Sequence, residues 1–455
     1  MYRKVMKRWL SRMLLVTAVL VLSAMPVAAA NLLFTAQDDL FNNARLGKIS
    51  GYRVQTLSGD IGGKYGQGIF PFKNANQERV AVTLCQTFDG VQPDVIQVYD
   101  PRSMGVPLAP VLTGHPYLPN IRSMVSKGSY LYGTSYMGKA NADNTKARVA
   151  RIRMSGSTYI PDTNRNHVYE YTPPSGDGHG EALVSYGNFL YALFTSQGGE
   201  YPNFVYNPSK LVKLNVNLAE VASVGLEGKN TDGGTLGATC LSGGTLYIAA
   251  WGGSQPTAPN YNPDSMIESV NLNNLSHTTC VTGSQVAGRE TGWRHHFTSI
   301  VIVGSTAYVQ AVSWNASWIG GEVRLYAVPV NSLGSLGRAH RVDTVSFSGG
   351  WRLGMVQDGQ YLWMAAGKNL RRYTLPANGS ANMVFGPQGV SLGGNISSFM
   401  PIPSLRSVFA AQVAQEEPVQ AMAAKDEKDG GSGCDAGFSW LLLLAVVPVA
   451  LRRRG

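Results

Sequence analysis

Two copies of a short motif combine side chains suited to ligand contact. Gly-Trp-Arg occurs twice, with Trp293 and Arg294 in one copy and Trp351 and Arg352 in the other. An indole offers a flat face for stacking, and a guanidinium offers several donors in one plane, so the pair suits sugars, peptides or anionic groups. The alternative interpretation is structural: each Trp packs between neighbouring units of the fold, and each Arg caps loop carbonyls.

Other patterns give weaker indications of chemistry. His295 and His296 are adjacent, but neighbours on a strand point to opposite faces, and no Cys or Asp pattern completes a four-ligand set. Gly-x-Ser-x-Gly occurs once, around Ser391, without the strand-to-helix turn that a nucleophile elbow needs. We therefore predict no catalytic residue, no metal site and no cofactor.

The elements that must position these residues repeat along the chain. A glycine followed by a short apolar strand recurs five times, and each copy ends in an aromatic residue: Tyr132, Tyr191, Tyr247, Tyr308 and Trp363. The spacings between these aromatics are 59, 56, 61 and 55 residues. An apolar strand precedes each copy, an alternating strand follows it, and a weaker fourth strand usually comes next. Each repeat therefore predicts four antiparallel strands.

Four strands at a regular period are the unit of a β-propeller, whereas a sheet sandwich gives no reason for such a repeat. An earlier unit over residues 69–112 fits the same plan and makes six complete units. Residues 396–411 supply two further strands, and residues 32–36 and 52–57 supply two more. We predict an all-β, single propeller over residues 31–412, with seven four-stranded blades and the last closed by both chain ends; six or eight blades are the alternatives. The body resembles propeller repeat proteins in architecture only.

One face of this propeller carries the long loops. The segments that join the second strand to the third are long and lie on the same face as the loops between blades, and they cover residues 135–146, 196–209, 252–265 and 313–321. Loops on a rigid scaffold commonly carry binding sites. The candidate ligand-binding residues on this face are Trp251, Trp293, Arg294, His295, Trp314, Trp318, Trp351 and Arg352.

Three cysteines fall in the body: Cys85, Cys240 and Cys280. The plan places Cys240 and Cys280 on the first and fourth strands of one unit, which is farther apart than a disulfide spans. We therefore predict free thiols.

The N-terminus has the three parts of a secretory signal peptide. Five cations precede an apolar run over residues 13–22, and small residues lead up to Ala30. The apolar run is shorter than the roughly 20 residues that a membrane span needs, so an uncleaved anchor is the weaker interpretation. We predict that residues 1–30 are removed after export.

The C-terminus has a second tripartite pattern. Residues 413–433 lack aromatic residues and are net acidic, which is typical of a flexible linker. Gly433 and Cys434 then lead into a short apolar stretch and three terminal arginines. Residues 434–455 resemble the Synergistes-type bacterial sorting domain. The resemblance implies transient membrane insertion, processing near Gly433 and Cys434 by a sorting protease, and attachment to the cell surface. A plain C-terminal anchor is the alternative.

The net charge of +10 lies mostly at the two ends, in the N-terminal cations and the terminal arginines. The body is therefore only mildly basic, and nucleic-acid binding loses its support. Together these features predict an exported, surface-anchored propeller that binds a glycan or protein ligand, with the export machinery and a sorting protease as further partners. The alternative is a secreted hydrolase or lyase at the mouth of the propeller channel, which would need titratable groups with perturbed pKa values around the axis.

Overall fold

The computed structural model divides the chain into two units, residues 1–415 and 416–455, and every residue it describes belongs to the first unit. The structure describes residues 31–37, 44–50, 53–58, 61, 65–74, 77–86, 94–101, 107–108, 112–136, 146–199, 204–253, 264–290, 295–315, 320–348, 353–367, 369–375, 384–391 and 395–401. The predicted signal peptide, acidic linker and sorting segment, with Gly433 and Cys434, lie outside these residues.

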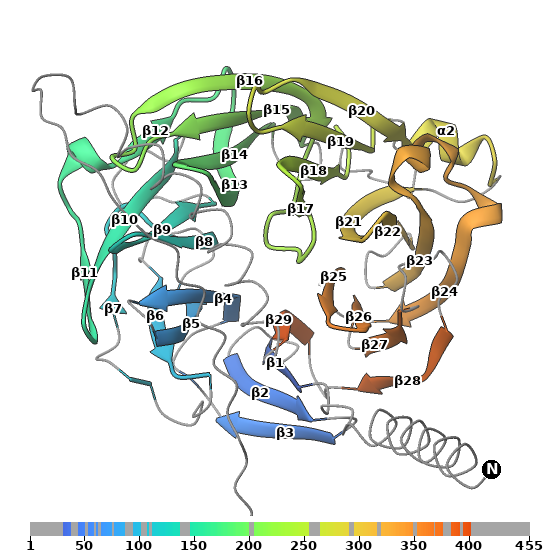
Figure 1. Cartoon of the computed structure of the whole chain (residues 1–455), viewed down its shortest axis with the longest axis horizontal. Helices are drawn as coiled ribbons and strands as arrows, with labels where there is room; N and C mark the ends of the chain where they lie inside the picture. The colour runs from blue at the N-terminus through green and yellow to red at the C-terminus, as the bar shows by residue number, and fades with distance from the viewer. Residues whose placement is uncertain are drawn as a thin grey trace, which may run out of the picture. The chain divides into compact units, whose positions relative to one another are not determined.

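The described strands form seven antiparallel sheets that follow one another around a ring (Figure 1). One sheet consists of β4 (Tyr65–Asn74), β5 (Gln77–Cys85), β6 (Val95–Tyr99) and β7 (Leu112–Thr113). The next consists of β8 (Ile121–Lys127), β9 (Tyr130–Ser135), β10 (Ala147–Ser155) and β11 (Thr158–Pro161), and β12 (Tyr169–Tyr171) also pairs with β10. The third consists of β13 (Asp177–Tyr186), β14 (Phe189–Gly198), β15 (Val205–Leu214) and β16 (Glu220–Lys229). The β-propeller class predicted from the repeats is confirmed.

Three further sheets continue the ring in chain order. They are β17 (Thr239–Ser242), β18 (Thr245–Ala250), β19 (Met266–Asn271) and β20 (His277–Thr282); then β21 (His296–Val303), β22 (Thr306–Trp314), β23 (Gly320–Pro329) and β24 (Arg341–Ser348); then β25 (Leu353–Asp358), β26 (Tyr361–Ala366), β27 (Asn369–Thr374) and β28 (Val384–Ser391). Short helical turns lie between strands: η1 (Arg165–His167) between β11 and β12, and α2 (Gly283–Ala287), η2 (Val330–Ser335) and η3 (Arg338–His340) among the later sheets. Within the described ranges, no helix has the length and apolar character needed to cross a membrane.

The remaining sheet joins the two ends of the described chain, in the order β29 (Asn395–Pro401), β1 (Asn31–Gln37), β2 (Ala44–Ser50) and β3 (Arg53–Ser58). We predicted two strands from each end. Among the described residues, one strand comes from the C-terminal part and three from the N-terminal part, and residues 402–411 of the predicted C-terminal pair lie outside the described residues. The missed strand is β2, in which Leu46 and Ile49 are buried. Arg45 and Lys48 interrupt its apolar pattern, which hid the strand in the sequence.

The strands nearest the axis are β4, β8, β13, β17, β21, β25 and β29 (Figure 1). The glycine of each repeat lies in the turn that leads away from such a strand. Gly187, for example, joins β13 to β14 with a φ of 54°, a backbone conformation that glycine adopts without strain and that suits the twist of a hairpin. The repeat signal in the sequence is therefore a turn followed by a buried second strand.

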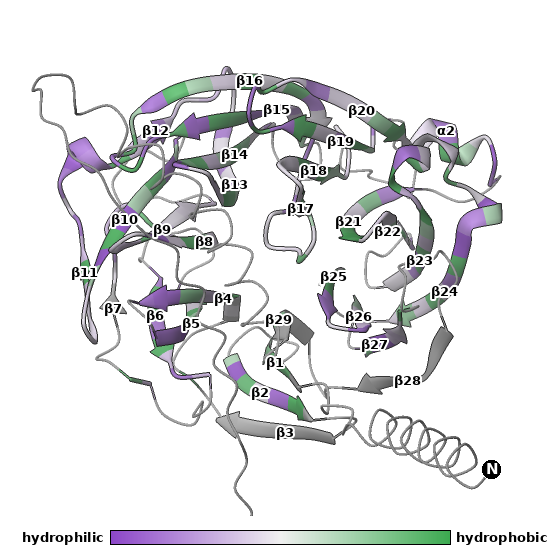
Figure 2. Cartoon of the chain, in the orientation of Figure 1, coloured by the Kyte–Doolittle hydropathy of each residue, from purple (hydrophilic) through white to green (hydrophobic). Residues whose placement is uncertain are grey.

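Apolar side chains fill the space between neighbouring sheets. One cluster joins Leu193 and Leu211 of one sheet to Ile248 and Val270 of the next, all of them buried. The outermost strands instead mix hydrophilic and hydrophobic residues along their length, as Figure 2 shows for β16. As predicted, Cys240 and Cys280 lie on the first and fourth strands of one sheet, and these two and Cys85 are free thiols.

Candidate functional site

Two of the predicted tryptophans meet at the long-loop face. Trp251 directly follows β18, and Trp314 ends β22, so both lie at the end of the second strand in adjacent sheets. Their ring centroids are 6.2 Å apart with an interplanar angle of 31°. Because the second strand of each sheet ends at this edge, both rings lie where the loops to the third strands begin.

The two rings differ in burial. Trp314 is 5% exposed and sits edge-on to Phe347, with ring centroids 5.4 Å apart. Trp251 is only partly buried and packs against the same apolar cluster. Its indole nitrogen is covered and has no hydrogen-bond partner among the described residues. Trp314 thus acts as a packed support, and Trp251 presents part of its ring surface.

The backbone around Trp251 is held on both sides. The Trp251 amide donates to the Asn230 carbonyl at 3.1 Å, and the Gly252 amide donates to the Lys229 carbonyl at 3.0 Å. The side chains of Lys229 and Asp264 form a partly exposed ion pair at 3.3 Å next to Gly253, two residues after Trp251. A rigid indole with an ion pair on the neighbouring loop suits a polar ligand that stacks on the ring.

His295 is not placed to contact a ligand in this structure, because its side chain is fully buried. Its Nε2 lies 3.1 Å from Glu290 Oε2 and 2.9 Å from the Tyr326 hydroxyl. Burial lowers the pKa of His295 to about 4, against the pull of Glu290, so the ring is neutral near pH 7. The predicted role in ligand contact thus gives way to a packed, hydrogen-bonded role. The other predicted ligand contacts lie outside the described residues: Trp293, Arg294, Trp318, Trp351 and Arg352.

A second cluster lies beside the axis, and the sequence analysis missed it. It brings together one residue of β8, one after β9, two of β13 and one from the segment ahead of β17: Arg122, Tyr136, His179, Glu181 and Asp232. Arg122 Nη1 lies 3.5 Å from Asp232 Oδ1, and its guanidinium lies 4.0 Å from the centroid of the Tyr136 ring. The Tyr136 and His179 rings are 4.3 Å apart.

Glu181 is the most enclosed acid of this cluster, at 2% exposure. Its Oε1 accepts from the Thr195 hydroxyl at 3.1 Å and its Oε2 accepts from the Gly233 amide at 3.0 Å. Burial raises the pKa of Glu181 to about 7, although the charge of Arg122 acts in the other direction. Burial also lowers the pKa of His179 to about 3. Both oxygens of Glu181 are therefore engaged with the protein itself.

Glu181 anchors a segment that crosses the middle of the ring. Residues 230–238 run toward the centre ahead of β17 (Figure 1). Beyond the bond to Glu181, the Leu236 carbonyl accepts from the Ser299 hydroxyl at 2.8 Å and from the Met355 amide at 2.9 Å. The Gly237 carbonyl accepts from the Ile300 amide at 2.7 Å. We call residues 230–238 the central segment; it ties together the inner strands β8, β13, β21 and β25.

The chemistry of the axis follows from these contacts. The titratable side chains converge as a channel-mouth enzyme would require, but they pair with one another and with the central segment. Within the part of the chain that the structure describes, no group of three or more His, Cys, Asp or Glu side chains is arranged to hold a metal ion.

Comparison with known proteins adds little to this description. No family model matches the chain, and no curated protein matches it. Among solved structures, the chain is similar to a functionally unknown protein from Desulfotomaculum acetoxidans DSM 771, with 11% identity and a TM-score of 0.43, over 82% of this chain and 98% of that one. A likeness at this level carries no argument, so the description of the fold rests on the sheets themselves.

Proposed function

We propose that this protein is an exported, surface-attached propeller that binds a glycan or protein ligand on its long-loop face, with Trp251 at the contact. The observation that carries the proposal is the partly exposed Trp251 ring, backed by the buried Trp314. Exposed aromatic rings held rigidly at the rim of a scaffold lose little entropy when they bind, and they stack on sugars and on peptide groups.

The surroundings of Trp251 support a polar ligand. The indole nitrogen of Trp251 is covered, so a ligand would meet the exposed part of the ring and the charged side chains near it. Lys229 and Asp264 offer opposite charges next to Gly253, two residues after the ring. The Gly-Trp-Arg motifs at Trp293 and Trp351 lie outside the described residues and precede β21 and β25 in the sequence.

The export half of the proposal rests on the chain termini. Residues 1–30 have the order of parts of a signal peptide, and residues 434–455 resemble a bacterial sorting domain around Gly433 and Cys434. Export, sorting and attachment at the cell surface or outer membrane follow from these two segments together.

A secreted hydrolase or lyase is the second candidate, and one observation favours it: His179, Glu181 and Asp232 converge beside the axis. Such convergence of acids and histidines with shifted pKa values is common in active sites. We rank it second because both Glu181 oxygens already accept hydrogen bonds from the protein and the central segment lies against the cluster. An enzyme of this type would lose all turnover of its substrate in an H179A variant.

The binding proposal is tested with purified cell-wall peptidoglycan as the probe. Trp251→Ala should weaken cosedimentation by at least about tenfold, because a stacked ring contributes on the order of 1.4 kcal/mol. Phe189→Ala is the matched control: a half-buried aromatic at the opposite edge of another sheet, which should bind like wild type. Cosedimentation of a W293A/W351A double variant with peptidoglycan is a second test. Unchanged binding in a folded W251A and in a folded double variant would overturn the proposal.

The export proposal is tested by mass spectrometry of the protein from its native cell. The expected mature chain begins after Ala30 and ends near Gly433 or Cys434. An intact terminus through Arg454 would contradict sorting, and an intact Met1 would contradict signal-peptide removal.

A further inference from the structure

A cleft lies at the edge of the sheets opposite the long-loop face and apart from the axial cluster. It has a volume of about 850 Å³ and lies between the sheet β17–β20 and the turn η2 of the next sheet. Ser305 at one wall precedes β22, whereas Trp314 ends β22, so the cleft and the tryptophan pair lie at opposite edges of the sheets. Clefts of this volume commonly hold small ligands.

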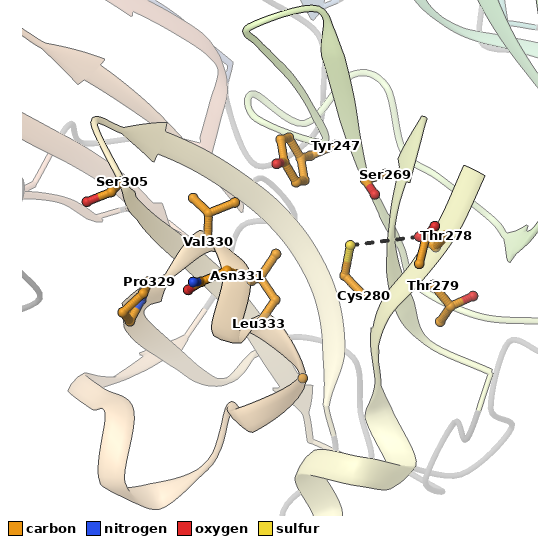
Figure 3. Close-up of a pocket in the computed structure, with 11 residues that line it drawn as sticks. Tyr247, Ser269, Thr278, Thr279, Cys280, Ser305, Pro329, Val330, Asn331 and Leu333 are labelled. Carbon is orange, nitrogen blue, oxygen red and sulfur yellow. Dashed lines mark hydrogen bonds between the residues drawn. The ribbon is translucent and has the colours of Figure 1, made fainter. Parts of the chain in front are cut away.

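The walls of the cleft carry polar and aliphatic side chains without formal charge. Tyr247, Ser269, Thr278 and Cys280 line the side formed by the sheet, and Val330, Asn331 and Leu333 line the facing side (Figure 3). Hydroxyl and amide groups thus alternate with aliphatic side chains, and the lining residues include no Lys, Arg, Asp or Glu. A site of this composition selects for an uncharged ligand with many hydrogen-bonding groups, since an ionic ligand would find no counter-charge.

Register explains why the polar side chains line up. Cys240 pairs with Tyr247, Tyr247 pairs with Ser269, and Ser269 pairs with Thr278, which forms one row across the four strands. Side chains directly opposite one another lie on the same face of a sheet. The row therefore presents a thiol, a phenol and two hydroxyls toward the neighbouring sheet.

The facing wall is built by an insertion. The connection between β23 and β24 carries η2, while the corresponding connection between β19 and β20 runs only from Asn271 to His277. The Val330 amide donates to the Ser305 carbonyl at 2.9 Å, and Arg289 donates to the Gly334 and Leu336 carbonyls at 2.7 Å each. Leu333 is 2% exposed. The wall is thus anchored before any ligand arrives, which lowers the entropy cost of binding.

Polar groups in the cleft are free to meet a ligand. Among the described residues, the hydroxyls of Tyr247, Thr278 and Ser305 have no hydrogen-bond partner, and Asn331 only accepts one at Oδ1, from Ser332. We propose that this cleft binds an uncharged saccharide. Sugar hydroxyls both donate and accept, as the lining requires, and the aliphatic side chains and the Tyr247 ring suit the apolar C–H faces of the sugar. The site is independent of Trp251 and goes beyond the proposed function.

Cys280 provides the test, because its thiol lies in the cleft. Alkylation of the full chain by iodoacetamide is followed by peptide mapping, with Cys240 as the internal control on the inner strand of the same sheet. The probes are maltotetraose, cellotetraose and chitotetraose. At twice its dissociation constant, a bound tetrasaccharide should slow Cys280 alkylation by about threefold and leave Cys240 unchanged. No protection by any of the three would overturn the proposal.

Variants and competitors sharpen the result. A T278V/N331A double variant should weaken protection by at least about tenfold, because it removes hydrogen-bonding groups from both walls. Asn166→Ala, at an exposed asparagine in η1, and Trp251→Ala should both give the same protection as wild type. Equal protection by tetragalacturonate would contradict the requirement for an uncharged ligand. Protection by a neutral Ser/Thr/Gly peptide alone would assign the cleft to a peptide and overturn the saccharide.

Discussion

Two buried glutamate–histidine pairs occupy comparable places in this propeller and have opposite electrostatics. Glu181 and His179 lie on β13, the inner strand of its sheet, and Glu290 and His295 lie just ahead of β21, the inner strand of another. All four side chains are nearly or fully buried. Burial raises the pKa of Glu181 to about 7, while the pKa of Glu290 is lowered.

The difference in pKa comes from cations in direct contact with Glu290. Burial acts to raise the pKa of Glu290 too, but hydrogen bonds from Tyr326, His295 and Arg324 outweigh it. Arg324 Nη1 lies 2.7 Å from Glu290 Oε2, and Arg341 Nη1 lies 3.5 Å from Oε1. Glu181 instead accepts from a hydroxyl and an amide. The acid at β21 is thus an ion-pair centre, and the acid at β13 is a hydrogen-bonding anchor that titrates near neutral pH.

The largest expected effect concerns the attachment at Glu181. Gly233→Ala would place a Cβ atom 1.6 Å from the Glu181 carbonyl oxygen, so the central segment must move away from β13. We expect the free energy of unfolding to fall by about 3 kcal/mol, measured by denaturant titration. Gly225→Ala on β16 is the matched control, because its Cβ meets nothing within 4 Å. Equal stability of the two variants would show that the central segment is not tightly held.

Neutralising each acid should lower the free energy of unfolding by a different amount in the two glutamate–histidine pairs. Glu290→Gln removes the buried carboxylate that Arg324 and Arg341 share, while Arg324 keeps its ion pair with Glu322, and it should cost about 3 kcal/mol at pH 7. Glu181→Gln keeps an acceptor for the Gly233 amide and should cost only about 1 kcal/mol. Thermal and denaturant unfolding of both variants against wild type measures the two losses. A larger loss for Glu181→Gln would reverse the comparison.

Much of the fold was predictable because its signals are local. A glycine turn followed by a buried strand with Tyr191 or Tyr308 near its start is set by neighbouring residues, so it appears in the sequence. The division of the closing sheet was missed, since β2 interrupts its apolar pattern with Arg45 and Lys48. Its place in the sheet depends on pairing with β1, not on its own residues.

The axial cluster was not predictable for a related reason. The central segment, with Asp232, Gly233 and Leu236, has the composition of an ordinary turn. Its role comes from contacts with strands as distant in sequence as β8 and β25. His295 shows the converse error: its type and place in the chain suggested a ligand contact, but burial beside Glu290 and Tyr326 was invisible without the fold.

The pH dependence of stability should differ between the two acids. The pKa of Glu181 is raised from its ordinary value of 4.5 to about 7, so its contribution is fully present below pH 4.5 and is lost as the pH rises through 7. The stability gap between wild type and Glu181→Gln should therefore shrink by about 1 kcal/mol per pH unit across this window. For Glu290 the pKa is lowered, so its contribution is lost only as the pH falls below 4.5. The Glu290→Gln gap should stay constant from pH 5 to pH 8, and parallel slopes for both variants would contradict the assignment.

The most local change isolates one hydrogen bond of the Glu181 anchor. Thr195→Val keeps the side-chain shape and removes the hydroxyl that donates to Glu181 Oε1 at 3.1 Å. Hydrogen bonds to an ionised acceptor are stronger than those to a neutral one, so the loss should be about 1 kcal/mol at pH 5 and about 2 kcal/mol at pH 8. Thr344→Val, at an exposed position of β24, should change stability little at either pH. The Glu290 pair keeps its charge between pH 5 and pH 8, so a stability loss that grows with pH locates the titrating acid at β13. A stability loss independent of pH would place the pKa of Glu181 outside this range.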